Sequence, residues 1–73
     1  MIFDREQFGR NLMFRLKQKH MSQQDLSDQS GVSRVAINRW INGNAVPSVD
    51  YLTVIAKVLD VTMDDLLKNV VKE

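Results

Sequence analysis

The chain has 73 residues, of which 44% are hydrophobic and 26% charged, and it carries a formal net charge of +1 at pH 7. This length predicts a single domain spanning residues 1–73, and because the sequence has no cysteine it offers neither a disulfide framework nor a thiolate metal site. No apolar run approaches the roughly 18 residues that a membrane span needs, and the start MIFDREQF lacks the order of a secretion signal, so we expect a cytoplasmic protein.

The first expected element is a helix over residues 5–19. Asp4, with Gln7 three positions later, forms an N-capping pattern for it. Its apolar residues recur every four positions, as on the buried face of a helix: Phe8, Leu12 and Leu16. Gly9 lies within this helix. Because glycine has no side chain, its presence there predicts that another helix comes close.

Two short helices around a glycine turn are expected between residues 22 and 43. Ser22 and Asp25 form a capping-box pattern, with Asp in the place usually held by Glu. Gly31 stands where the first of these helices must stop, because only glycine enters the left-handed conformation of such a turn at little cost. Ser33 then begins the next helix. This arrangement is typical of proteins that lay a helix into a DNA groove.

The helix that begins after Ser33 is amphipathic. Its inward face is expected to carry Ala36, Ile37, Trp40 and Ile41. Its outer face is expected to carry Arg34, Val35, Asn38, Arg39 and Asn42. Arginine can form paired hydrogen bonds with guanine and asparagine with adenine, while valine can touch the methyl group of thymine. A polar outer face can also serve solubility alone, but the turn pattern that precedes it favours contact with DNA.

The run NGNAVPS predicts a surface loop that ends at Ser48, the expected cap of a fourth helix. The inward stripe expected for that helix is Tyr51, Leu52, Ile55, Ala56 and Leu59. Asp60 closes it.

Thr62 and Asp65 mark a short fifth helix. We expect Leu66 and Leu67 to pack against the first helix. Val70 and Val71, near the end, are expected to fray or to meet a partner. The sequence therefore predicts an all-α domain of five helices with no strand.

These residues resemble the Cro and phage-repressor type of helix-turn-helix, also called the XRE family. The resemblance runs from about Phe8 to Leu67, and its most specific segments are SQQDL, GVS, AINRWINGN and PSVDYLTVIAKVLDVTMDDLL. It implies a compact five-helix bundle of the lambda-repressor-like type, with the helix-turn-helix at the second and third helices.

The resemblance also implies which side chains meet DNA. Those that would contact base edges from the third helix are Arg34, Val35, Asn38 and Arg39. Those that would contact the DNA backbone are Gln23, Ser33, Asn42, Gly43 and Asn44. In the family, the glutamine at the position of Gln23 holds a phosphate and braces the recognition helix.

Three positions depart from the family pattern. Members often carry arginine in place of Leu16 and glutamate in place of Ile41, and these two charges form a buried ion pair. Because replacing both partners leaves no charge stranded, we expect Leu16 and Ile41 to touch. Ser27 stands where alanine is usual, and its hydroxyl is expected to bond to the carbonyl one turn earlier.

The charges are unevenly distributed along the chain. Residues 1–43 carry seven basic and four acidic side chains, whereas residues 44–73 carry three and five. The helix-turn-helix half is therefore the basic half, which lowers repulsion by phosphates where the third helix would dock.

We therefore predict a transcriptional regulator of the repressor type that binds double-stranded DNA sequence-specifically, with the third helix in the major groove. The resemblance suggests a homodimer on an inverted-repeat operator. The alternative is a protein-interaction module on the same fold, such as an antitoxin or an anti-repressor, for which Trp40 and Val35 would matter more than charge.

No catalytic pattern is present, so we do not expect an enzyme. Acidic pairs stand in the first turns of helices, where capping explains them, and the sequence has no glycine-rich phosphate loop, HxxxH spacing or serine–histidine set. The only histidine, His20, is expected to be a solvated turn residue. No cofactor, metal or small-molecule ligand is expected.

Overall fold

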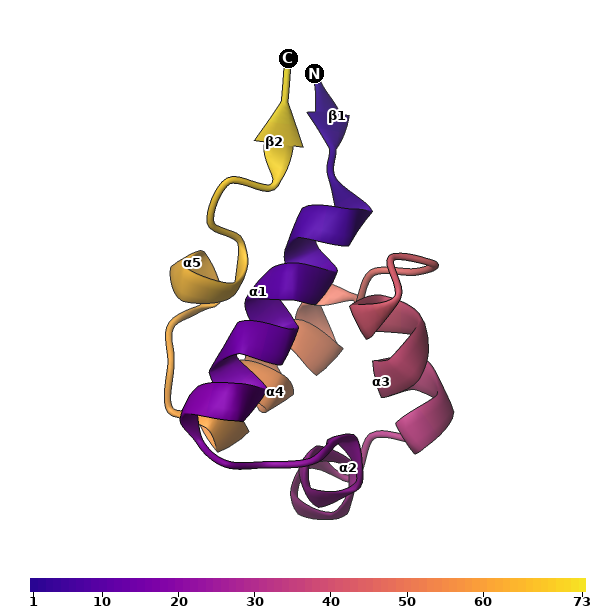
Figure 1. The fold of residues 1–73 in the computed structure, drawn as a ribbon, viewed down its shortest axis with the longest axis vertical. Coiled ribbons are helices and arrows are strands. Elements are labelled where there is room, and N and C mark those ends of the chain that lie inside the picture. Colours follow the sequence, from indigo (N-terminus) through magenta and orange to yellow (C-terminus); the bar gives the residue numbers. More distant parts are fainter.

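The computed structural model describes residues 1–73 as five helices and a two-stranded ribbon (Figure 1). The helices are α1 (Arg5–Gln18), α2 (Gln23–Ser30), α3 (Arg34–Ile41), α4 (Val49–Leu59) and α5 (Met63–Leu66). Strands β1 (Ile2–Phe3) and β2 (Val71–Lys72) bring the two chain ends side by side, at the end of the molecule opposite α2. The five-helix prediction is confirmed, whereas the expectation of no strand is wrong.

The ribbon is held in place by Asp4. Its backbone N–H donates to the carbonyl oxygen of Val70, and its carboxylate accepts from the backbone N–H of Gln7 at 3.0 Å and pairs with the ammonium of Lys72 at 3.3 Å. These bonds draw Val70 into the core, where it is only 4% exposed. The expectation that Val70 frays or meets a partner is therefore wrong, because the capping residue of α1 also fixes the far end of the chain.

One hydrophobic core joins all five helices. Its buried members are Phe8, Leu12, Leu16, Leu26, Val32, Ile37, Trp40, Leu52, Ile55, Ala56, Leu59, Leu66 and Val70. Tyr51 was expected on the inward stripe of α4, but it is 51% exposed and lies against Trp40 with the ring centroids 5.9 Å apart. Tyr51 is thus half exposed, with its ring packed against the buried indole of Trp40.

The helix ends follow the sequence closely. Both capping boxes form: Ser22 with Asp25 at α2, and Thr62 with Asp65 at α5. Ser48 is the N-cap residue of α4 by backbone conformation, although its hydroxyl makes no capping bond. Asp60 ends α4 in the left-handed conformation, with φ of 55°.

At Gly9, α1 lies directly against the backbone of α3. A Cβ atom built on Gly9 would lie 2.8 Å from the carbonyl oxygen of Trp40 and would clash with the carbonyl oxygen of Ile41. The predicted close approach is confirmed, and it involves the backbone at the last turn of α3. Leu16 is buried and Ile41 packs against the same core, while direct contact between their side chains stays a prediction.

Gly9→Ala is expected to destabilise the protein even though alanine favours helix over glycine by about 1 kcal/mol. The added methyl group meets backbone carbonyls that cannot rotate away, so the free energy of unfolding should fall by about 1–3 kcal/mol in urea denaturation. An increase in stability, as at an uncrowded helix position, would contradict the close approach.

The matched control is Gly31, where a Cβ atom would meet nothing within 4 Å and only the positive φ of 75° requires glycine. Asparagine tolerates that conformation, so Gly31→Asn should cost less than Gly31→Ala. At Gly9, asparagine should cost at least as much as alanine because there the obstacle is space.

The folding stability is also expected to depend on pH in the acidic range. Hydrogen bonds from the backbone N–H groups of Gln7, Ser22 and Thr62 lower the pKa of Asp4, Asp25 and Asp65, respectively, below the ordinary value of 3.8. The unfolded chain therefore binds more protons in this range, so the stability gained above about pH 4 is lost as pH falls through the lower folded values.

Thermal unfolding between pH 6 and pH 2 should show the midpoint falling below about pH 4. The triple variant Asp4→Asn, Asp25→Asn, Asp65→Asn keeps a side-chain oxygen that can accept the same backbone N–H bonds but removes the titrating groups. Its midpoint should fall less steeply over the same interval, and an equally steep fall would assign the acid sensitivity to other groups.

Candidate nucleic-acid interface

The turn between α2 and α3 is built by glycine and two serine hydroxyls. Gly31 adopts φ of 75° and its N–H donates to the carbonyl of Ser27. The hydroxyl of Ser27 donates to the carbonyl of Val32 at 2.6 Å, and the hydroxyl of Ser30 donates to the carbonyl of Leu26 at 2.6 Å. Ser30 also accepts from the backbone N–H of Val32 at 3.1 Å. The turn thus has a fixed shape.

The direction of the Ser27 bond differs from expectation. The hydroxyl was expected to bond back to the carbonyl one turn earlier, but it bonds forward to Val32. The carbonyl of Val32 lies between α2 and α3, outside either helix, and gains a donor from Ser27. The small serine therefore ties the two helices together.

The third helix, α3, begins at a side-chain cap. The hydroxyl of Ser33 accepts from the backbone N–H of Ala36 at 3.1 Å. Ile37 and Trp40 are buried beneath the helix, as the periodicity predicts. The four residues expected to face bases are all exposed: Arg34, Val35, Asn38 and Arg39. We call these four the α3 ridge.

Three amide side chains link α2 to the α3 ridge. The Nδ2 atom of Asn38 donates to Oε1 of Gln23 at 3.2 Å, and the Nδ2 atom of Asn42 donates to Oδ1 of Asn38 at 3.0 Å. We call Gln23, Asn38 and Asn42 the amide chain. Gln23, in the first turn of α2, lies beside the ridge through this bond, so these helices are joined by side chains as well as by the turn.

The loop after α3 is compact. Gly43 has φ of 76° and its N–H donates to the carbonyl of Trp40, while the N–H of Asn44 donates to the carbonyl of Arg39 at 2.9 Å. Asn42 and Asn44 are exposed on either side of the half-buried Gly43. The residues expected to contact the DNA backbone thus lie at the start of α2, at the start of α3 and just after α3.

Two charged features of this surface were not among the site residues predicted from the sequence. A Cβ atom on Gly43 would lie 3.0 Å from Cγ of Glu6, so an acidic side chain packs against the loop expected to face phosphates. Glu6 is 37 positions away in sequence, and no local pattern predicts this contact.

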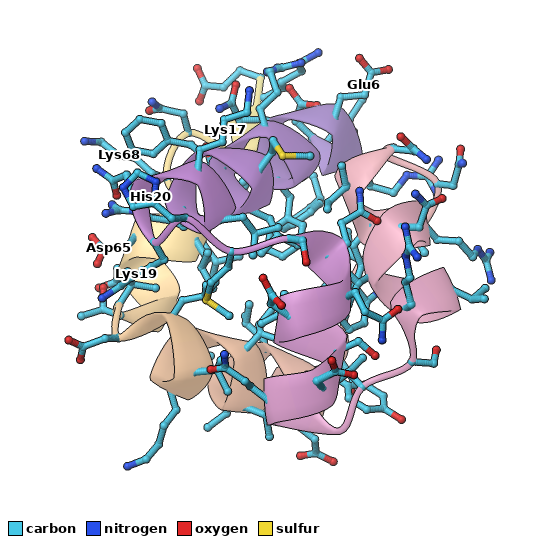
Figure 2. The ribbon with its side chains drawn as sticks, turned by 60° about the horizontal axis from the view of Figure 1, so that its bottom comes forward. Glu6, Lys17, Lys19, His20, Asp65 and Lys68 are labelled. Atoms are coloured by element: carbon cyan, nitrogen blue, oxygen red, sulfur yellow. The ribbon has the colours of Figure 1, made fainter.

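The other feature is a basic cluster at the end of α1 that leads into α2. In the view of Figure 2, Lys17, Lys19 and His20 lie at this end of α1, with Lys68 and Asp65 on the same side of the molecule. Asp65 pairs with Arg15 at 3.6 Å. The run KQKH at residues 17–20 is a signal for part of this cluster, but Lys68 arrives from the distant segment after α5.

The surface has no pocket, and no three side chains of histidine, cysteine, aspartate or glutamate gather as a metal site would require. None of the five helices combines the length and the apolar character that crossing a bilayer demands. The surface instead presents α3, an exposed helix with polar and cationic side chains that suit binding in a groove.

Comparison of sequences finds relatives among transcriptional regulators. Residues 12–66 match the family model described as Helix-turn-helix. The chain is 39% identical over 51 residues to the HTH-type transcriptional activator BcrR of Enterococcus faecalis, which covers 70% of this chain and 25% of that protein. It is 37% identical over 62 residues to the uncharacterized HTH-type transcriptional regulator YqaE of Bacillus subtilis (strain 168), covering 85% of this chain and 53% of that protein. The chain thus spans about a quarter and about half of these two relatives.

Solved structures share the fold. The restriction-modification controller protein C.AhdI from Aeromonas hydrophila superposes with a TM-score of 0.82 at 27% identity, over 86% of this chain and 96% of that one. A transcriptional regulator from Vibrio cholerae gives a TM-score of 0.82 at 21% identity, over 90% of this chain and 37% of that one. The SOS-response transcriptional repressor LexA from Eubacterium rectale gives 0.78 at 23% identity, over 100% of this chain and 82% of that one. The last two comparisons support the fold alone.

Proposed function

The chain belongs to the helix-turn-helix family, and on that premise we propose that it is a transcriptional regulator that binds double-stranded DNA sequence-specifically, with α3 in the major groove. The observation that carries the proposal is the α3 ridge, which projects from a helix whose other face is buried in the core. An α-helix fits the major groove, where base edges differ most from one another.

The chemistry of the ridge matches base edges. Arg34 and Arg39 carry the planar donor groups that pair with guanine, Asn38 offers an amide suited to adenine, and Val35, at 72% exposed, can touch a thymine methyl group. Val35 is the one apolar residue of the α3 ridge, and a methyl contact in the groove would give its exposed side chain a role. This is the direct-readout part of the proposed interface.

Backbone contacts would hold the ridge in register. We assign this role to Gln23, Ser33, Asn42, Gly43 and Asn44. They flank the α3 ridge at the starts of α2 and α3 and in the loop after α3, where they would meet phosphates beside the groove. Such contacts set position and affinity without reading sequence.

A single module of this size buries little surface on DNA, so we propose that a homodimer binds an inverted-repeat operator with half-sites about 10 base pairs apart or a multiple of that spacing. The repressor type stays our prediction for the regulatory outcome. The protein would act in the compartment that holds the DNA, which we expect to be the cytoplasm.

The structure weakens the alternative of a protein-interaction module. That alternative needs Trp40 as an apolar anchor, but Trp40 is only 4% exposed and its ring is covered by the core and Tyr51. Val35 remains exposed, but it is one apolar residue on a ridge that otherwise carries two arginines and an asparagine. The comparisons point to a DNA-binding regulator and not to an enzyme.

Selection of bound duplexes from a random library at near-physiological salt tests the proposal directly. A recurring sequence with two-fold symmetry is expected, and its affinity should fall steeply as salt rises because bound phosphates release counterions. Failure to enrich any sequence, or binding that is insensitive to salt, would contradict the proposal.

Arg34→Ala and Arg39→Ala are each expected to cost about 1–3 kcal/mol in binding the selected duplex and to relax the preference at one base pair. Binding can be measured by fluorescence anisotropy on the selected and a scrambled duplex. Lys57→Ala, which removes an exposed cation from α4, is the matched control and should leave base preference unchanged. Equal losses on both duplexes would assign the arginines to phosphates instead.

Glu6→Gln is expected to strengthen binding to selected and scrambled duplexes alike, by about twofold to fivefold at low salt, because it removes a negative charge beside the phosphate-facing loop. The gain should shrink as salt screens the charge. Glu73→Gln, at the end of the chain, serves as the control. No gain at low salt would place Glu6 outside the DNA interface.

A further inference from the structure

Asn42 ends α3 as its C-cap residue and is followed directly by Gly43. Because glycine has no side chain, its backbone nitrogen is the least shielded nucleophile that can follow an asparagine. No other asparagine in the chain precedes a glycine. The chain has asparagine at five positions: Asn11, Asn38, Asn42, Asn44 and Asn69.

This pair of residues can react with itself. The backbone nitrogen of Gly43 loses its proton to solvent and attacks Cγ of the Asn42 side chain, which forms a new C–N bond and closes a succinimide ring. The bond between Cγ and Nδ2 breaks, and the side-chain nitrogen takes up a proton and leaves as ammonia. Water then adds to one of the two ring carbonyl carbons and opens the ring. The products are aspartate or isoaspartate, with water consumed and ammonia released.

The folded structure holds the pair in an unreactive form. The N–H of Gly43 donates to the carbonyl of Trp40 at 3.2 Å, and the N–H of Asn42 donates to the carbonyl of Asn38 at 3.0 Å. An N–H that is bound to a helix carbonyl does not readily lose its proton. The reaction therefore waits until the last turn of α3 opens, and helix ends open at a much lower free-energy cost than the core. The Asn42 side chain is already exposed to water.

Conversion changes the surface proposed to meet DNA. It places a carboxylate at Asn42, beside a loop against which the acidic Glu6 already packs. A carboxylate has no N–H, so the bond from Asn42 to Oδ1 of Asn38 is lost. Isoaspartate also lengthens the backbone by one carbon, which displaces the N–H of Asn44 from the carbonyl of Arg39. Both products thus oppose binding to phosphates.

We propose that Asn42 and Gly43 form a deamidation site, that conversion of Asn42 to aspartate or isoaspartate ends DNA binding by that molecule, and that bound DNA delays the conversion. The loop assigned to phosphate contacts is the loop that must open for the reaction, so an occupied interface suppresses it. The effect on DNA rests on the proposed function, whereas the conversion itself needs no ligand.

The first experiment follows the conversion over time. Purified protein is incubated at neutral pH and physiological temperature, and converted molecules are separated by ion exchange and located by peptide mapping. Conversion should occur at Asn42 and be faster in urea, where the bond to Trp40 is absent. Asn44, exposed in the same loop but followed by alanine, is the internal control and should stay intact.

The second experiment adds the selected duplex during the incubation. If bound molecules do not react, a duplex concentration ten times the Kd should slow conversion about tenfold, because only the free fraction can react. The scrambled duplex at the same concentration should slow it less. Equal rates with and without the selected duplex would overturn the proposed protection.

The third experiment measures the affinity of the converted protein by fluorescence anisotropy, beside the variant Asn42→Asp. Both should bind the selected duplex about fivefold or more weakly at low salt, and the loss should shrink as salt screens the added charge. Asn42→Gln cannot close the same small ring, so it should keep its starting affinity throughout the incubation while the wild-type protein loses affinity. Thermal unfolding of each variant serves as the folding control.

The outcomes separate this inference from the proposed function. If fresh protein binds no duplex in a salt-dependent way, the proposed function fails, while conversion at Asn42 can still be measured. If fresh protein binds DNA but Asn42 stays intact for as long as full conversion takes in urea, the inference fails alone. It fails in the same way if the converted protein binds as tightly as fresh protein.

Discussion

The backbone of α3 rests on Gly9 of α1, and that contact decides where the α3 ridge points. No side chain separates the two helices there, so the carbonyl groups of Trp40 and Ile41 approach the α1 backbone directly. The side chain of Trp40, in the last turn of α3, is buried in the core and anchors the same end of the helix. A larger residue on α1 would move the end of α3, and every side chain on the ridge would move with it. The orientation of the ridge is therefore set by a residue far from any expected DNA contact.

Hydrogen bonds between polar groups add to the rigidity that the hydrophobic core provides. Ser27 and Ser30 satisfy backbone groups in the turn, and the amide chain joins Gln23 to the exposed side of α3. These bonds exist before any ligand is present, so less conformational freedom is lost when the ridge meets a groove. Rigidity of this kind favours discrimination between bases, because a side chain that cannot turn cannot adapt to the wrong partner.

Features that depend on neighbouring residues were predictable from the sequence. The capping boxes at Ser22 and Thr62, the glycine turn at Gly31 and the exposure of the ridge all follow from short spacings. Most features that join distant segments were not, although Gly9 marked the close approach of another helix. The ribbon, the forward bond of Ser27 and the bond between Gln23 and Asn38 depend on how helices cross, and no periodicity carries that information. The family resemblance indicated that Gln23 braces the third helix, but only the structure identifies Asn38 as its partner.

The antiparallel ribbon places the first and last residues next to each other, at the pole of the molecule farthest from α2 (Figure 1). A short peptide could join them into a closed backbone, and new termini could then be opened in a surface loop without dismantling the core. For the same reason, any domain fused to either end would emerge from the same place, at the end of the molecule opposite α2. The architecture therefore suits modular attachment, because both ends of the chain leave the domain at one point away from α2.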